Sequence, residues 1–189
     1  MQIVPTKFIK KQESTTTLLA IAKALNWGKM VIKPAISAAA FHTYIVKAND
    51  LEHENIFQQL LKTRDMLVQE FQETIKTKGE ASLMIFNGIF THAILKKAKK
   101  NDFRVQDDFG GTVHHYTPTP KEIAFAEKTY KQCPHNPVYG RVDIMWDEED
   151  DCYLSEVEFL DPEIWLRNAP EKAQFLADAI IEYGLLSLD

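Results

Sequence analysis

Four charged residues in the last third of the sequence have types and spacing that could hold a divalent cation. Arg141 and Asp143 alternate along one segment, and Glu156 and Glu158 alternate along the next. Mg²⁺ prefers hard oxygen ligands and usually takes one or two protein carboxylates beside phosphate oxygens and water. Three carboxylates and one guanidinium therefore suit a metal bound to a phosphorylated ligand better than an all-protein metal cage.

These four residues require a β-hairpin that turns through the acidic run 147–151. With the turn centred between the third and fourth residues of that run, Asp143 lies opposite Glu156 and Arg141 lies opposite Glu158. Side chains alternate along a strand, so all four share one face, with opposed Cβ atoms about 4.5–5.5 Å apart. A bound cation would relieve the repulsion between the carboxylates. The alternative is a solvated charged face on which Arg141 bridges Glu158.

Three basic residues elsewhere could bind an anionic ligand. Lys33 ends a short apolar segment, where an ammonium can reach a phosphate as a point charge. Arg104 precedes a pair of glycines at 110–111, and a guanidinium suits planar, multi-oxygen anions. Lys96 lies in a basic run, and strand alternation lets only one of Lys96 and Lys97 face a given site. Each also has an ordinary alternative, as an edge lysine, a turn arginine or a solvated lysine.

The elements that must position these residues alternate between helix and strand signals, which indicates an α/β or α+β protein. Asn87-Gly88 between two apolar segments predicts a hairpin with a type I′ turn. Thr119-Pro120-Lys121-Glu122 combines a capping box with proline at the first helical position. Further helices are expected at 15–26, from Asp50 onward and at 170–184, strands at 30–33 and 66–71, a hairpin at 138–159, and a loop at 99–118.

Composition limits the function classes. The chain has 189 residues, 45% of them hydrophobic, and a net charge of -5, which argues against a broad nucleic-acid surface. No apolar run is long enough to cross a membrane, and the N-terminus is too short and polar for a signal peptide. Two cysteines without a ligand pattern argue against a disulfide framework or a structural zinc site. Reduced thiols in a cytoplasmic protein are the expectation.

Taken in order, the motifs resemble the ATP-grasp domain of the prokaryotic glutathione synthetase and ribosomal-protein-S6 modification ligase type. The motifs that carry the resemblance are Val31-Ile32-Lys33-Pro34, Met66-Leu67-Val68-Gln69-Glu70-Phe71, Gly79-Glu80, Asn87-Gly88, Asp102-Phe103-Arg104-Val105-Gln106 with Gly110-Gly111, Arg141-Val142-Asp143-Ile144 and Ser155-Glu156-Val157-Glu158-Phe159-Leu160-Asp161-Pro162. The resemblance implies an α+β fold of two lobes, 1–66 and 67–189, whose antiparallel sheets clamp ATP.

The resemblance also implies a role for each site residue. Lys33 and Lys96 would lie near the nucleotide phosphates, Gln69, Glu70 and Phe71 would hold adenine largely through backbone groups, and Glu80 would accept hydrogen bonds from the ribose. Asp143, Glu156 and Glu158 would hold Mg²⁺, or Mn²⁺ in its place. Arg104 would bind the acyl phosphate or the developing tetrahedral centre, and Arg141 is the second catalytic candidate.

The implied activity is an ATP-dependent carboxylate–amine or carboxylate–thiol ligase that acts through an acyl phosphate on small molecules, with neither nucleic acid nor membrane as a partner. Three residues depart from the family pattern: the loop after Lys33 lacks glycines, Ser82 replaces a basic residue, and Glu158 replaces asparagine. Family members also carry a preceding α/β domain, so we expect a longer protein or a partner chain. The alternatives are an ATP-binding module without ligase activity and an acidic structural domain without a ligand.

Overall fold

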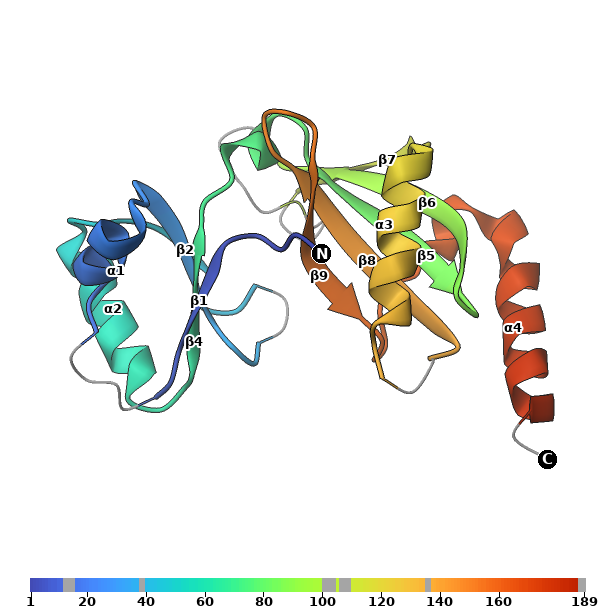
Figure 1. Cartoon of the computed structure of the whole chain (residues 1–189), viewed down its shortest axis with the longest axis horizontal. Coiled ribbons are helices and arrows are strands. Elements are labelled where there is room, and N and C mark those ends of the chain that lie inside the picture. The colour runs from blue at the N-terminus through green and yellow to red at the C-terminus, as the bar shows by residue number, and fades with distance from the viewer. Residues whose placement is uncertain (12–15, 38–39, 100–104, 106–109, 135–136, 187–189) are drawn as a thin grey trace. The chain divides into compact units, whose positions relative to one another are not determined.

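The chain folds into two compact units, described here from a computed structural model (Figure 1). The structure describes all residues except 12–15, 38–39, 100–104, 106–109, 135–136 and 187–189. The first unit comprises Val4–Gln72, and the second comprises Met1–Ile3 together with Glu73–Asp189. Each unit has its own antiparallel sheet, which confirms the expected α+β architecture with two sheets.

The first unit is a four-stranded sheet with two helices. Its strands are β1 (Thr6–Ile9), β2 (Lys29–Pro34), β3 (Tyr44–Lys47) and β4 (Met66–Glu70), in the order β1-β4-β2-β3. The helices are α1 (Leu18–Leu25) and α2 (Leu51–Leu61). Their apolar faces pack on the sheet in one core that includes Leu18, Ile21, Phe57 and Leu61.

The local sequence explains where both helices begin. Thr17 is the N-cap of α1, and its hydroxyl accepts a hydrogen bond of 3.1 Å from the Ala20 amide. Asp50, the predicted N-cap of α2, accepts one of 3.1 Å from the His53 amide. At the other end of α1, Asn26 adopts φ 57° in the left-handed region, where asparagine is tolerated.

The second unit is a five-stranded sheet with one helix across a face. Its strands are β5 (Glu80–Phe86), β6 (Ile89–Lys97), β7 (Thr112–Tyr116), β8 (Tyr139–Trp146) and β9 (Cys152–Glu158), in the order β7-β6-β5-β8-β9. Helix α3 (Pro120–Lys131) lies across one face (Figure 1) and packs on Leu83, Ile85 and Val142 through Ala126 and Tyr130. Short 3₁₀ helices occupy Glu73–Lys76 (η1), Leu166–Asn168 (η3) and Pro170–Lys172 (η4), and α4 spans Ala173–Leu186.

Two predicted turns position the strands. Asn87 and Gly88 join β5 to β6 with φ 47° and 79°, as a type I′ turn requires. Thr119 and Glu122 form the predicted capping box of α3, with Pro120 in the first turn. Both motifs adopt the structure that the sequence predicts, because their geometry depends on local chemistry alone.

Three expectations differ from the structure. The loop expected over 99–118 contains strand β7, which pairs with β6 through Leu95 and His114. Helix α4 continues through Gly184 to Leu186 instead of ending at the glycine. The lobe boundary was expected after residue 66, whereas the units divide after Gln72, because β4 pairs with β1 and β2 inside the first unit.

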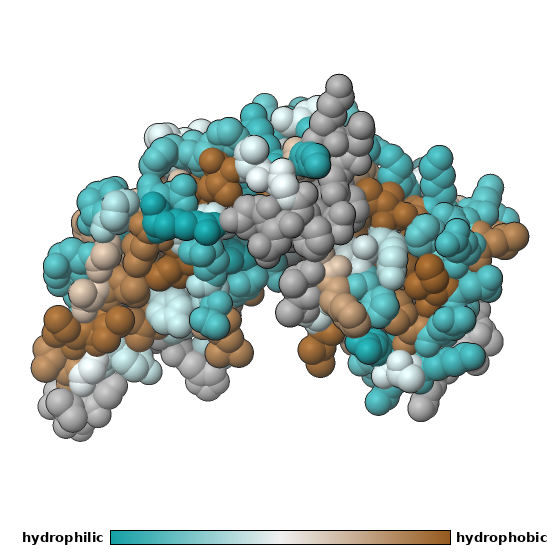
Figure 2. Space-filling view, turned by 180° about the vertical axis from the view of Figure 1, so that it is seen from behind, coloured by the Kyte–Doolittle hydropathy of each residue, from teal (hydrophilic) through white to brown (hydrophobic). Residues whose placement is uncertain are grey.

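Helix α4 carries apolar side chains on most of its surface. Phe175, Ile180, Ile181, Tyr183 and Leu185 are each 48–63% exposed, whereas Ala179 is buried against the sheet. Figure 2 shows apolar residues gathered where this helix lies. Among the described residues, no helix has both the length and the apolar character needed to span a membrane.

Candidate functional site

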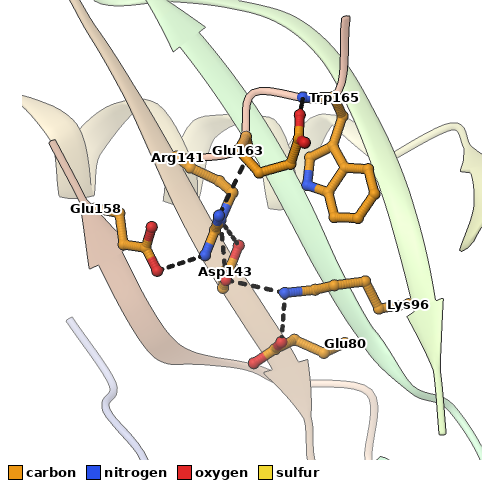
Figure 3. Close-up of polar contacts among 7 residues, drawn as sticks. All are labelled: Glu80, Lys96, Arg141, Asp143, Glu158, Glu163 and Trp165. Atoms are coloured by element: carbon orange, nitrogen blue, oxygen red, sulfur yellow. Dashed lines mark hydrogen bonds and ion pairs between the residues drawn. The ribbon is translucent and has the colours of Figure 1, made fainter. Parts of the chain in front are cut away.

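The strands of the second unit bring five of the predicted site residues onto one face of its sheet. Glu80 of β5 is paired with Lys96 of β6, and Arg141 of β8 is paired with Glu158 of β9. Asp143 lies between these pairs, opposite Ser82 on β5. Figure 3 shows the side chains of all five pointing toward one another. They come from strands that are adjacent in the order β6-β5-β8-β9.

Lys96 and Asp143 form a buried ion pair at the centre of this cluster. The Lys96 ammonium lies 3.0 Å from the Asp143 carboxylate and 2.7 Å from that of Glu80. Asp143 is 1% exposed and Lys96 is 5% exposed, so the pair is shielded from water. Burial alone would raise the pKa of Asp143, but the charges of Lys96 and Arg141 hold that pKa below its ordinary value. Asp143 is therefore ionised at neutral pH.

Arg141 joins the two halves of the cluster. Its Nε donates to Asp143 at 2.9 Å, and its terminal nitrogen donates to Glu158 at 2.6 Å. The guanidinium is buried at 8% exposure, which excludes the alternative of a simple solvated face. The ion pair between Arg141 and Glu158, which the solvated-face alternative also expected, is nonetheless present. Burial opposes the charge of Arg141, but the adjacent Asp143 and Glu158 carboxylates raise its pKa above the ordinary value.

Glu156 differs from the other carboxylates, because among the described residues it has neither an ion pair nor a hydrogen bond. Glu156 is exposed. Partial desolvation of its carboxyl together with the charges of Asp143, Glu158 and Glu80 raises its pKa to about 7, against the opposing effect of the Arg141 charge. A carboxyl without an ion pair of its own beside other carboxylates is suited to accept a cation.

The donor set fits a cation that brings further ligands of its own. Within the described residues, no three histidine, cysteine or carboxylate side chains gather closely enough to hold a metal alone. Three of the four carboxylates already share the charges of Lys96 and Arg141. Glu156 and the outer oxygen of Glu158 could supply the one or two protein ligands that Mg²⁺ usually takes.

A β-bulge sets the alignment of these carboxylates. Asp143 is paired with Glu156, as predicted, but the next pair is Ile144 with Leu154. Ser155 is therefore an extra residue on β9, and the turn is centred half a residue earlier than predicted. Without the bulge, the shift in register would place Glu156 on the opposite face of the sheet.

Four more of the predicted residues lie in the first unit. Lys33 is half-buried on β2, where it is paired with Leu67. Gln69 donates from its side chain to the Thr6 hydroxyl at 2.8 Å. The backbone amides of Glu70 and Phe71 donate to the Pro5 and Lys29 carbonyls at 2.9 and 3.0 Å. Because these two amides are already satisfied, any hydrogen bond from this pair of residues to adenine would be accepted by their carbonyls.

Phe71 has a further contact within this unit. Its ring is buried, and the Lys29 ammonium lies 5.0 Å from the ring centroid. This cation–π contact fixes the orientation of the ring. The remaining predicted residue, Arg104, lies outside the described residues, as do its neighbours 100–103.

Sequence reasoning missed the segment that follows β9. The Glu163 carbonyl accepts from Arg141 at 3.4 Å, and the Ile164 carbonyl lies 2.8 Å from Nε2 of His92. Trp165 is buried, and its backbone adopts the left-handed conformation at φ 57°. Its amide donates to the Glu163 carboxylate at 2.8 Å (Figure 3). The only local signal was Asp161-Pro162-Glu163, which indicates a turn but not its contacts.

Comparisons with known proteins agree with this fold. The family model of the prokaryotic glutathione synthetase ATP-grasp domain matches residues 1–142. A search of curated proteins found no match. Among solved structures, D-cycloserine synthetase DcsG has a TM-score of 0.77 at 21% identity, covering 96% of this chain and 65% of that one.

Two further solved structures are similar. D-alanine–D-alanine ligase from Bacillus anthracis complexed with ATP has a TM-score of 0.72 at 19% identity, with 99% of this chain and 62% of that chain covered. ATP-grasp ligase PsnB, complexed with Mg and ADP, has a TM-score of 0.66 at 14% identity, with 95% of this chain and 54% of that chain covered. The chain thus spans less than two thirds of the length of these structures. Since the family model matches well over half of the chain, the chain belongs to the prokaryotic glutathione synthetase ATP-grasp family.

Proposed function

We propose that the chain binds Mg-ATP and is all or part of a ligase that activates a carboxylate as an acyl phosphate. The observation that carries the proposal is the buried arrangement of Glu80, Lys96, Arg141 and Asp143 beside Glu156, which forms no ion pair among the described residues. Burial of these charged groups carries a desolvation penalty that apolar residues of similar volume would not, which makes a ligand-binding role the best explanation for the network. Membership of an ATP-grasp family supports ATP as that ligand.

In the proposed reaction, a substrate carboxylate oxygen attacks the γ-phosphorus of ATP and ADP leaves. An amine or thiol then attacks the acyl carbon, and inorganic phosphate leaves. Arg141 would hold the oxygens of the transferred group, and Lys96 would neutralise phosphate charge while Asp143 orients both cations. Glu156 and Glu158 would hold Mg²⁺ or Mn²⁺, which supplies positive charge at the phosphate oxygens.

Roles for the remaining residues rest on the family resemblance. Lys33 would contact phosphate, the segment Gln69–Phe71 would hold adenine, Glu80 would accept from the ribose hydroxyls, and Arg104 would bind the acyl phosphate. The carboxylate and the nucleophile are expected to be small molecules.

Calorimetry with ATP tests the nucleotide step. Binding heat when ATP and Mg²⁺ are titrated into the protein, which disappears when EDTA is added, would support the proposal. If there is neither binding heat nor a thermal shift, the remaining interpretation is an acidic structural domain. ADP release that depends on an added carboxylate, taken from a panel of amino acids and dipeptides, tests the ligase step.

The second candidate function is a nucleotide-binding module without ligase activity. The loop after Lys33 favours it, because the run Ser37-Ala38-Ala39-Ala40 lacks the glycines that the family pattern has there. Mg-ATP binding without carboxylate-dependent ADP release from any member of the panel would select this candidate.

A further inference from the structure

A cavity lies on the face of the second unit's sheet opposite the charged cluster of the candidate site. Leu95 lines it and is the neighbour of Lys96 on β6, so the two side chains point to opposite faces. Trp146 lines it from β8, three residues beyond Asp143. The cavity holds about 560 Å³, within the range of small-molecule sites, and belongs wholly to the second unit.

The floor of this cavity is apolar and aromatic. It is formed by Leu95, Tyr116, Trp146 and Cys152, and the rings of Tyr116 and Trp146 meet edge to face at 5.9 Å between centroids. The polar atoms of both rings are already used, because the Tyr116 hydroxyl and the Trp146 indole nitrogen donate to the Glu122 carboxylate at 2.9 and 2.7 Å. The floor therefore presents mainly ring faces and aliphatic carbon, which suit a flat apolar group.

The mouth of the cavity carries charges of both signs. Lys78 and Lys121 line it beside Asp150 from the turn between β8 and β9. The Lys78 ammonium lies 2.6 Å from Asp150, and Lys121 lies 2.5 Å from Asp151. These pairs are solvent-accessible, and such pairs contribute little stability, so a ligand can exchange into them at little cost. Two ammonium groups and a carboxylate can pair with a ligand that carries both a carboxylate and an ammonium.

We propose that this cavity binds a free amino acid with a large aromatic side chain, at a site separate from the nucleotide cluster. The side chain lies against Tyr116 and Trp146, the ligand carboxylate pairs with Lys78 and Lys121, and the ligand ammonium pairs with Asp150. The aromatic floor selects the side chain, and the mixed charges at the mouth select a zwitterion over a simple acid or amine.

Calorimetry with L-phenylalanine tests the site, with L-alanine, 3-phenylpropionate and phenethylamine as comparison ligands. We expect L-phenylalanine to bind at least about tenfold more tightly than each of the three, because each lacks one contact. In the ¹⁵N NMR spectrum the Trp146 indole signal should shift on binding, whereas that of Trp27 in the first unit should not. Absence of phenylalanine binding, or equal binding of 3-phenylpropionate, would overturn the proposal.

Matched variants locate the binding. Asp150→Asn retains a residue that tolerates the left-handed backbone found there, at φ 65°, and should weaken phenylalanine binding about tenfold. Glu149→Gln, on the same turn but outside the cavity lining, should leave the affinity unchanged. If the Asp150→Asn chain and the native chain bind phenylalanine with equal affinity, the assignment of the site is overturned. Because ATP is absent from these experiments, the result is independent of the proposed ligase function.

Discussion

The Lys96 ammonium and the Asp143 carboxylate lie 3.0 Å apart across the intervening strand β5, and both are buried. Removal of Lys96 leaves Asp143 with Arg141 as its one remaining ion-pair partner among the described residues, and removal of Asp143 leaves Lys96 with Glu80. This pair holds Arg141 and Glu80 in place through shared contacts. The stability of the second unit and the geometry of the candidate site therefore depend on the same interaction.

Replacement of Lys96 should destabilise the second unit strongly. Lys96→Met leaves the buried Glu80 carboxylate without its cation and leaves Asp143 with Arg141 alone, which we expect to cost about 3–5 kcal/mol of unfolding free energy. Urea unfolding followed by tryptophan fluorescence measures the change. Lys97→Met is the matched control, because Lys97 is exposed, and should change stability by less than about 0.5 kcal/mol. Equal stabilities of the two variants would contradict a structural role for the ion pair.

Gly79 should tolerate no side chain. It has φ +84°, and a Cβ atom there would lie 2.3 Å from the backbone oxygen of Lys96. Gly79→Ala should therefore cost about 2 kcal/mol or more and displace the adjacent Glu80. Gly28→Ala is the control, because nothing lies within 4 Å of its added Cβ. Thermal unfolding of both variants measures the difference, and a Gly79→Ala chain as stable as the Gly28→Ala chain would refute the steric argument.

Local chemistry explains which parts of the fold could be predicted. The turn at Asn87-Gly88 and the capping box at Thr119 depend on residues a few positions apart, and both form. The pairing of Asp143 with Glu156 was also predicted, although from a turn centred half a residue too late. The bulge at Ser155 compensates for that error, and no residue type in the segment indicates a bulge.

Interactions between distant segments could not be predicted in the same way. Strand alternation allowed either Lys96 or Lys97 to face the site, and the choice depends on the register with β5, where Glu80 is paired with Lys96. The contact between Arg141 and the Glu163 carbonyl depends on how the chain returns after β9. Strand β7 was missed because two glycines precede it and histidines occupy its centre.

The stability of the second unit should fall as the pH drops below about 6.5, because of His92. Burial lowers the pKa of His92, although its hydrogen bond with the Ile164 carbonyl partly opposes this shift. Below the unfolded-state pKa the unfolded chain binds more protons than the folded one, so acid favours unfolding. Urea midpoints between pH 7.5 and 5.5 should decrease for the native chain and decrease less for His92→Gln. Parallel plots of urea midpoint against pH for the two chains would show that groups other than His92 cause the loss of stability.

Loss of the Glu156 carboxyl should weaken Mg-ATP binding more than loss of any carboxyl in the turn between β8 and β9. Glu156 faces Asp143 across the strands and forms no ion pair among the described residues, whereas Glu149 lies in the turn, away from Asp143. Glu156→Ala should raise the dissociation constant of Mg-ATP about tenfold or more, since one charged ligand to the cation is lost. Glu149→Ala should leave it unchanged. Calorimetry at fixed Mg²⁺ compares the two, and equal dissociation constants would remove the metal assignment from β9.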